Sequence, residues 1–433
     1  MKDPGPLLPN LAFFEALANT AEIKDPQERE AWSRELQAAV LVLRFFSDWA
    51  GFPAITHDAI SQRKVMRDKI AAVQNHSARY LFGSVVGLMY RSDGDPEDVT
   101  APLLAYAWLL EEREQYTLAT DLLWTVARAL EPARGPGRRM VGYPLAATIE
   151  RRLGDLALRR GDLDAAESHY QQQLTFARFG GDKAMILHAR TLIVRVQQTR
   201  GNLGTADSAL GTIIADAAEG DDARAEAYAR RIRGSVRHRQ GRYEEALADH
   251  FRAYTIAPEW VEREWLLVDI AACCFDLGHL ALARLAFISL AKTAHNAPAR
   301  SLALINLLEM AVLEDDRTSF DVLVRQLNGL EMPIEQQLYR DLYQAGGIAL
   351  WEGAEAGRAA YDALVVRARQ VGQHAFEFRA IEAAGKLDRP VEVVEPAAEP
   401  SGSATWESLS KAIEAECYSR LEAVGATAEL SDE

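Results

Sequence analysis

The chain has 433 residues, of which 48% are hydrophobic, a fraction typical of folded proteins and too high for a disordered chain. Its formal net charge of −15 argues against general nucleic-acid binding, because a phosphate backbone would be repelled at long range. Glycine and proline are sparse and fall between helical stretches, which favours an all-α fold.

The beginning of the sequence and its cysteines indicate the compartment. Residues 1–6 lack the basic start and apolar core of a signal peptide, and apolar runs such as residues 39–43 are too short to span a bilayer. Cys273, Cys274 and Cys417 form no CxxC pair, so neither a zinc site nor a disulfide framework is indicated. We therefore expect a cytoplasmic protein with buried thiols and no membrane partner.

The first hundred residues are predicted to be helical. Between Glu30 and Ala50, apolar residues recur on one helical face. A second helix is expected over residues 58–90, and the acidic, proline-containing segment 93–98 then breaks the pattern. We interpret residues 1–100 as an N-terminal helical cap that covers the exposed apolar face of a first repeat.

A repeat begins after this region, and its clearest marks are the glycines Gly161, Gly201 and Gly241, spaced every 40 residues, with Gly278 following at a shorter interval. A glycine can end a helix in the left-handed conformation at little cost. Each glycine is followed two residues later by a large side chain that is expected to fill the gap between two antiparallel helices: Leu163, Leu203, Tyr243 and Leu280. Three residues further on, an alanine allows close helix approach: Ala166, Ala206, Ala246 and Ala283. Four residues later an apolar anchor follows: Tyr170, Leu210 and Phe287, with His250 in the third copy.

This pattern resembles the tetratricopeptide repeat, and an earlier stretch, residues 116–132, matches the second half of the motif. The resemblance covers about residues 101–385. It implies a right-handed α-solenoid of antiparallel helix pairs, a superhelix that serves as a binding scaffold. The family period is usually about 34 residues. The longer spacing lengthens each helix, as in regulatory helical-repeat domains of bacterial signalling proteins.

Motifs of catalysis are missing from the sequence. It contains no GxxxxGK phosphate loop, no GxSxG nucleophile elbow and no HExxH metal motif. The histidines are scattered and show no ligand-like spacing with the cysteines. We therefore expect no enzyme activity, no cofactor and no metal.

The resemblance also implies which side chains face a partner, because the first helix of each repeat lines the concave surface in this family. Counting from the residue seven before each turn glycine, Gly154, Val194 or Gly234, predicts the groove residues. They are Arg151, Asp155, Arg159, His188, Thr191, Arg195, Tyr228, Arg231, Ser235, His238, Arg239 and Trp265.

Two interpretations of these residues stay open. Five arginines on the inner face of an acidic protein favour a groove for an acidic peptide or a partner protein, because guanidinium groups bind carboxylates through two parallel hydrogen bonds. Alternatively, they form a solvated helix face with ion pairs one turn apart, such as Asp155 with Arg159.

The last part of the chain is predicted to form a tethered helix. Residues 386–404 are rich in proline, glutamate and serine, as in a linker, residues 405–425 form an amphipathic helix, and residues 426–433 form a disordered tail. The apolar side of this helix begins with Trp406, Leu409 and Ile413. The helix either docks back on the array as a capping helix or binds another protein or covers the groove.

Taken together, these features predict a non-catalytic protein-interaction scaffold or adaptor that binds a partner protein or an acidic peptide in an arginine-rich groove. The alternative is a ligand- or cleavage-controlled regulator, an inhibitor in a bacterial signalling or defence pathway, with the tethered helix as its switch. Self-association stays open in both cases.

Overall fold

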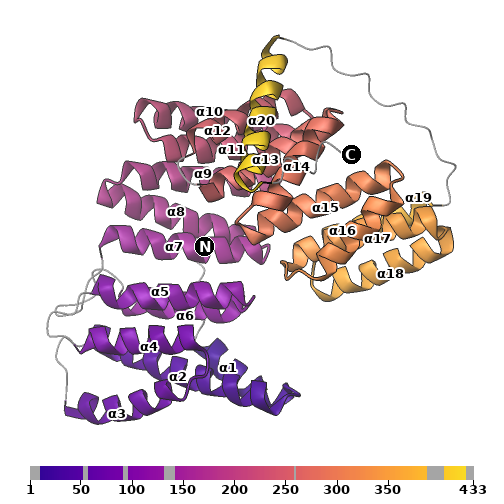
Figure 1. Cartoon of the computed structure of the whole chain (residues 1–433). Coiled ribbons are helices and arrows are strands. Elements are labelled where there is room, and N and C mark those ends of the chain that lie inside the picture. Colours follow the sequence, from indigo (N-terminus) through magenta and orange to yellow (C-terminus); the bar gives the residue numbers. More distant parts are fainter. Residues whose placement is uncertain are drawn as a thin grey trace. The chain divides into compact units, whose positions relative to one another are not determined.

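The computed structural model describes residues 10–51, 57–90, 96–130, 142–257, 260–387 and 404–425. Within these ranges the chain forms twenty α-helices and one short 3-10 helix and no strand (Figure 1), which confirms the predicted all-α class. Pro132, most of the predicted linker and the predicted tail lie outside the described residues.

The chain divides into two compact units, Met1–Asn202 and Leu203–Glu433. The division falls between α9 and α10, the two helices of the repeat that contains Gly201. It does not coincide with the boundary expected at residue 100. Each unit is described by itself below.

Unit 1 contains nine α-helices in its described part. They are α1 (Leu11–Asn19), α2 (Pro26–Gly51), α3 (His57–Ala71), α4 (His76–Met89), α5 (Pro96–Glu112), α6 (Tyr116–Ala129), α7 (Tyr143–Arg159), α8 (Leu163–Gly180) and α9 (Lys183–Thr199), with a 3-10 turn at Thr20–Glu22. The single helix predicted over residues 58–90 is wrong: α3 and α4 are separate. The carboxamide of Asn75 accepts a hydrogen bond from the Ala78 amide at 2.8 Å, so it caps α4 and starts a new helix there.

The N-terminal helices of unit 1 share one apolar core with the first repeats. This core runs from Phe13 on α1 to Leu156 on α7. Asp121 on α6 accepts hydrogen bonds from the backbone amides of Asn10 and Ala12 at 3.0 and 2.8 Å, which places a carboxylate at the start of α1. Helix α1, which the sequence pattern did not predict, is therefore fixed to a repeat helix by both apolar and polar contacts.

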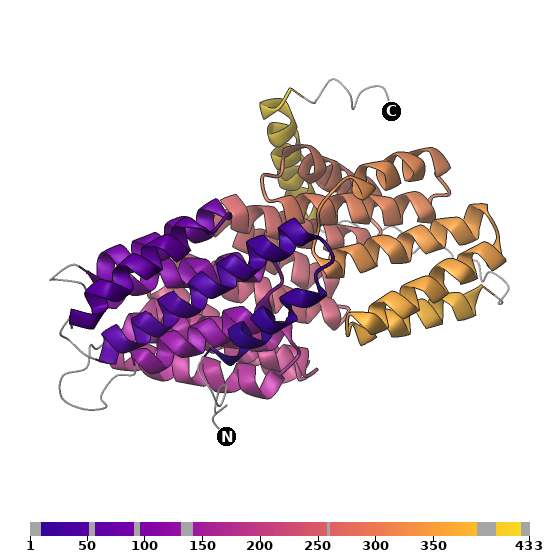
Figure 2. The ribbon, with the colours of Figure 1, turned by 90° about the horizontal axis from the view of Figure 1, so that it is seen from below.

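Unit 2 continues the helix pairs. Its helices are α10 (Leu203–Glu219), α11 (Ala223–Arg239), α12 (Tyr243–Ile256), α13 (Trp260–Asp276), α14 (Leu280–Thr293), α15 (Ala297–Leu313), α16 (Arg317–Asn328), α17 (Ile334–Trp351), α18 (Ala354–Gln370), α19 (His374–Lys386) and α20 (Ala404–Ala423). Helices α10 to α19 pack against their neighbours in chain order (Figures 1 and 2). Helix α20 departs from this order and packs against α14.

The turn glycines behave as the repeat pattern predicts. All four have positive φ angles, from 74° at Gly241 to 88° at Gly201. The four following alanines and the anchors are buried, but Leu280 is 40% exposed and its three counterparts are half-buried. These large residues therefore fill the gap between helices only in part, and the Tyr243 ring packs edge-on against His238 of the preceding helix. They begin the second helix of each pair, and side chains at a helix start lean back over the preceding turn.

Glycines in the first helix of two pairs receive the anchors of the second helix. A Cβ on Gly154 would lie 2.5 Å from the Tyr170 ring, and a Cβ on Gly234 would lie 2.5 Å from the His250 ring. Each ring therefore packs directly on the backbone of the first helix at a glycine. This brings the Tyr170 hydroxyl and the His250 ring nitrogens toward the side of the helix that carries the predicted groove residues.

Candidate functional site

The predicted groove residues are carried by the first helices of the repeats. Those on α7 and α9 belong to unit 1, and those on α11 and α13 belong to unit 2. We call the side of α11 and α13 that carries Arg231, His238, Trp265, Asp269 and Asp276, together with the corresponding sides of α15 and α17, the A face of unit 2.

On α7 in unit 1, Asp155 is the centre of a small polar group. It accepts a hydrogen bond from Arg151 at 3.2 Å and another from the Tyr170 hydroxyl at 2.9 Å. Arg159 lies with its guanidinium 5.9 Å from the centre of the Tyr116 ring. The ion pair of this helix thus joins Asp155 to the residue one turn before it, whereas the alternative interpretation placed it with Arg159.

On α9 the predicted residues differ in exposure. The Nδ1 atom of His188 lies 3.5 Å from the amide nitrogen of Gln173, and Arg195 is exposed. Thr191 is buried, and its hydroxyl donates to the Leu187 carbonyl at 2.9 Å. Thr191 therefore does not face a groove, because a side chain that is 1% exposed is not available to a partner.

In unit 2, Arg231 is held between a carboxylate and an aromatic ring. Its Nε donates to Asp269 Oδ2 at 2.7 Å, and its guanidinium lies 5.7 Å from the centre of the Trp265 ring. The Ser235 hydroxyl donates to the Arg231 carbonyl at 3.1 Å. Arg231 is 31% exposed, so its outer edge still reaches solvent.

Arg231 belongs to a ladder of three contacts between α11 and α13, two of which are ion pairs of arginine and one a histidine–carboxylate hydrogen bond. The pairs are Arg224–Glu262 at 3.5 Å, Arg231–Asp269 at 2.7 Å and His238–Asp276 at 2.6 Å. Along each helix, successive members are seven residues apart, which is about two helical turns. Two arginines and His238 of α11 thus stand opposite three carboxylates of α13, so each of these carboxylates has a basic side chain as its partner.

The carboxylates of this ladder were missed by the sequence interpretation, which placed only Trp265 on α13. Glu262, Asp269 and Asp276 repeat the seven-residue spacing of the basic residues of α11. The same spacing in two successive first helices was the signal in the sequence that could have predicted these contacts. Tyr228 and Arg239 also lie on α11 and are half-buried and exposed, respectively.

His250 lies behind the central ion pair. It is 2% exposed, its Nδ1 has no hydrogen-bond partner among the described residues, and this atom is 4.0 Å from Asp269 Oδ2. Burial lowers the pKa of His250, the nearby Asp269 carboxylate opposes this, and the Arg231 charge adds to it. The imidazole is thus kept neutral just below the surface of the A face.

Further along unit 2, the A face becomes less ionic. Glu309 on α15 is hydrogen-bonded to Tyr343 on α17, and burial raises the pKa of both groups. Leu313 and Leu350 are 67% and 49% exposed, and they follow Glu309 and Tyr343 by one and two helical turns on the same sides of their helices. The A face therefore offers apolar contact beside its charged part.

Helix α20 is placed on the second helices of the repeats. The Trp406 ring stacks on His279, just before α14, with ring centres 3.8 Å apart. Ile413 is buried, and Leu409 packs against the same apolar cluster of α12 to α14. The described part of α20 thus docks on its own array, chiefly on α14.

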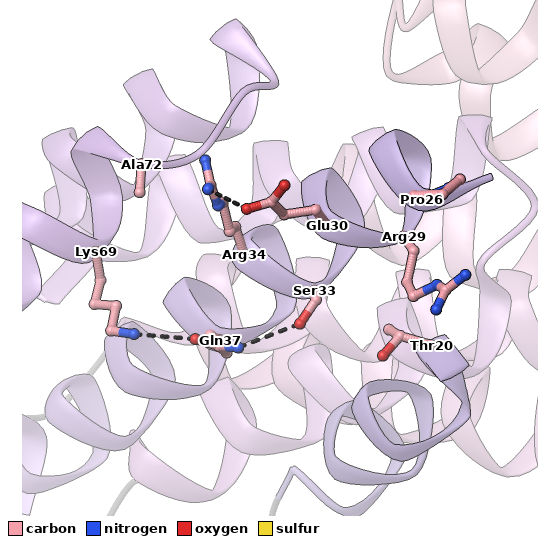
Figure 3. A pocket seen from close by; sticks show the side chains of 9 residues that line it. All are labelled: Thr20, Pro26, Arg29, Glu30, Ser33, Arg34, Gln37, Lys69 and Ala72. Atoms are coloured by element: carbon pink, nitrogen blue, oxygen red, sulfur yellow. Dashed lines mark hydrogen bonds and ion pairs between the residues drawn. The ribbon is translucent and has the colours of Figure 1, made fainter. Parts of the chain in front are cut away.

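A pocket of about 560 Å³ lies in unit 1 between α2 and the end of α3 (Figure 3). Its basic residues already make local contacts: Lys69 donates to Gln37 at 3.1 Å, and Arg34 pairs with Glu30. Arg29 donates to the Ile23 carbonyl at 3.0 Å. The pocket therefore has no evident unsatisfied group that would select a ligand.

Neither a metal cluster nor a membrane span is found in the described part of the chain. No three His, Cys, Asp or Glu side chains there are grouped so that they could hold a metal ion. None of the described helices is long and apolar enough to cross a membrane.

Comparison with known proteins gives no family: no family model and no curated protein matches the chain. Among solved structures, a Rap protein complexed with Competence and Sporulation Factor is 12% identical, with a TM-score of 0.46 over 82% of this chain and 98% of that one. Apo RapI is 9% identical, with a TM-score of 0.43 over 87% and 91% of the two chains. The apo quorum sensor NprR from B. thuringiensis is 12% identical, with a TM-score of 0.38 over 87% and 92%. At these values the likeness carries no argument about function.

Proposed function

We propose that this chain is a non-catalytic scaffold whose A face in unit 2 binds a partner protein or a peptide that carries carboxylates. The observation that supports this most directly is the half-exposed Arg231 guanidinium above the Trp265 ring. Such a pair offers a partner a planar cation and an aromatic surface at one point, which is typical of binding hot spots.

The contacts of Arg231 define how a partner would bind. Asp269 already accepts from Arg231, so an incoming carboxylate would replace or share this hydrogen bond. An exchange of one charged partner for another contributes little net affinity and mainly sets register and orientation. The affinity would then come from apolar side chains against Trp265, Leu313 and Leu350, of which the two leucines are exposed.

The remaining predicted groove residues of unit 2, Tyr228, Ser235, His238 and Arg239, belong to the same proposal as further partner contacts. Those of unit 1, Arg151, Asp155, Arg159, His188 and Arg195, are proposed separately as a partner surface of that unit. The cytoplasm as the location and a bacterial pathway are likewise part of the proposal.

The test is capture of partners from the native cell by the tagged full-length chain. We expect the variant R231A/W265A to lose the partner that the unchanged chain captures while it stays folded. Loss of the half-exposed ion pair costs only about 0–1 kcal/mol, and loss of the half-buried Trp265 ring, which packs against the apolar core, lowers the stability further. Partner binding that involves exposed charges should also weaken as salt is raised.

The matched control is Arg252→Ala, which removes an exposed arginine from α12. It should leave capture unchanged. If R231A/W265A folds normally and still captures the same proteins in the same amounts, the A face is not the binding site.

A second candidate function is a regulator in which α20 acts as a switch. It is favoured by the docking of α20 on helices more than a hundred residues away in sequence. A protease site placed between residues 388 and 403 would allow the folded full chain to be cut. Altered partner capture after the cut would support the switch, and equal affinity before and after would argue against it.

A further inference from the structure

The surface under α20 carries both apolar and polar recognition elements. We define the α20 groove by Tyr254 on α12, Glu264 on α13, His279 before α14, and Ser289 and Thr293 on α14. These residues come from three consecutive helices of unit 2 and all contact α20. The groove is therefore formed by the array alone, and α20 only fills it.

The apolar contact of α20 is a single row of side chains. Ile413, Cys417 and Leu421 are spaced by four residues and are at most 1% exposed. They lie against the same side of the array as Trp406, which stacks on His279. Helix α20 thus has one buried residue per turn and polar residues on its other faces. This is the pattern with which amphipathic helices bind in grooves.

The polar contacts fix the register of this helix. The Tyr254 hydroxyl donates to Glu416 at 2.5 Å. Arg420 donates to Thr293 at 3.1 Å and to Glu264 at 3.4 Å, and Glu264 is 1% exposed. A helix that occupies this groove must thus supply an acceptor and a cation at fixed distances from its apolar row.

None of the described contacts of α20 depends on the chain connection. They join residues that are 127 to 162 positions apart. Seventeen residues, 387–403, separate α19 from α20, and such a segment spans at most about 60 Å when fully extended. An α20 helix from another molecule would meet the same side chains in the same register.

We infer that the α20 groove is an interaction surface for α20 of a second copy of this chain, so that two copies exchange this helix. The apolar row, the Glu416 acceptor and the Arg420 cation together match the side chains of the groove. The α20 helix of a second copy carries all three in the same spacing. The inference is independent of partner binding at the A face, because it uses α12, α14 and the buried Glu264.

The tether decides when the exchange takes place. A helix joined to its binding surface through a segment of this length has an effective concentration of about millimolar. At lower protein concentrations each chain therefore fills its own groove. A groove whose own helix is prevented from docking would take the helix of a neighbour instead.

Two full-length variants test this by complementation. The first, I413D/C417D, places charges in the apolar row and leaves the groove intact. The second, Thr293→Trp, fills the half-exposed rim of the groove at the Arg420 position and leaves α20 intact. Each variant alone should be monomeric by light scattering, and an equimolar mixture should form a one-to-one dimer of twice the mass.

Cys417 supplies an independent readout. It is fully buried under docked α20, and burial raises its pKa to about 12. In Thr293→Trp alone, Cys417 should react with a maleimide much faster than in the unchanged chain. Addition of I413D/C417D should restore its protection, as measured by site-resolved mass spectrometry.

The control for the exposed side of α20 is Tyr418→Ala in the Thr293→Trp chain, since Tyr418 is 47% exposed. It should leave the dimer unchanged. The inference is overturned if both variants unfold cooperatively like the unchanged chain and their mixture stays monomeric with Cys417 reactive. A dimer that also forms from I413D/C417D alone would overturn it as well, because another surface would then hold the copies together.

Discussion

Helix α11 carries arginines on two sides, and the two sides meet different surroundings. Toward α12, the side chain of Asp249 is 3% exposed and accepts hydrogen bonds from Arg233 at 2.5 and 2.7 Å and from Arg237 at 2.9 Å. Toward the A face, Arg231 bonds to Asp269, whose side chain is 25% exposed. The same residue type in one helix thus holds the interior together on one side and faces solvent on the other.

The difference between the two sides lies in desolvation. A charge removed from water loses several kcal/mol of hydration, which hydrogen-bonded partners must offset. Around Asp249 several guanidinium groups do so, and removal of the carboxylate would leave their charges buried together. Around Asp269 water can replace a lost partner. A charged residue in the sequence therefore indicates a partner-binding position only when its side chain is known to be exposed.

The largest expected effect separates the two sides directly. Asp249→Asn should lower the free energy of unfolding by about 3–5 kcal/mol, because it breaks a buried ionic network. Asp269→Asn should cost about 0–1 kcal/mol, as expected for a half-exposed pair. Urea denaturation followed by circular dichroism measures both. Equal losses would contradict the distinction between interior and surface arginines.

An intermediate effect is expected where His250 crosses α11. Gly234→Ala would put a methyl group 2.5 Å from the His250 ring, and such overpacking typically costs about 1–3 kcal/mol. The control is Gly211→Ala on α10, where the nearest other atom is 3.8 Å away. There, alanine should stabilise the helix by about 0.5–1 kcal/mol. Addition of His250→Ala should relieve the clash in G234A, and an absence of this coupling would show that the ring does not lie there.

The smallest effect is a change in pH dependence. His250 faces Asp269 and Asp249, which raise its pKa, and Arg231 and His238, which lower it, but burial is the largest cause and lowers the pKa overall. Below an unfolded pKa of about 6.5, the unfolded chain therefore binds more protons than the folded chain. This contribution to stability is complete above that pH and is lost as the pH falls toward the folded pKa.

His250→Phe tests this, since Phe287 occupies the same position in the next repeat. The variant lacks the titrating group, so it does not lose this part of its stability in acid. Its unfolding free energy minus that of the unchanged chain should therefore increase as the pH is lowered from 7 to 5. Denaturant titrations at several pH values measure the difference. A difference that stays constant over this range would contradict a buried neutral imidazole.

The repeat could be predicted from the sequence because its marks are local. The turn glycine, the following alanine and the anchor act within one helix pair, and each position has a conformational or packing reason of its own. The split between α3 and α4 was missed although Asn75 is a good capping residue. Apolar residues on both sides of the break made one long helix the simpler interpretation.

The surroundings of the candidate site could be predicted only in part. The positions of Arg231 and Trp265 follow from the repeat frame, but the pairing of Arg231 with Asp269 depends on how two helices are rotated against each other. The docking site of α20 could not be predicted from the sequence pattern for a similar reason. Its apolar row is visible in the sequence, whereas the groove that accepts it is assembled from three helices.

The distance in sequence between α20 and its groove has a consequence for biosynthesis. A ribosome adds about 5–20 residues per second, and helix pairs that contact their neighbours can fold as they emerge. The groove on α14 is complete some 128 residues before Cys417 is made, a delay of roughly 6–25 seconds. During this interval the nascent chain presents an uncovered apolar surface, which a chaperone or the finished α20 of a neighbouring chain on the same messenger RNA can reach first.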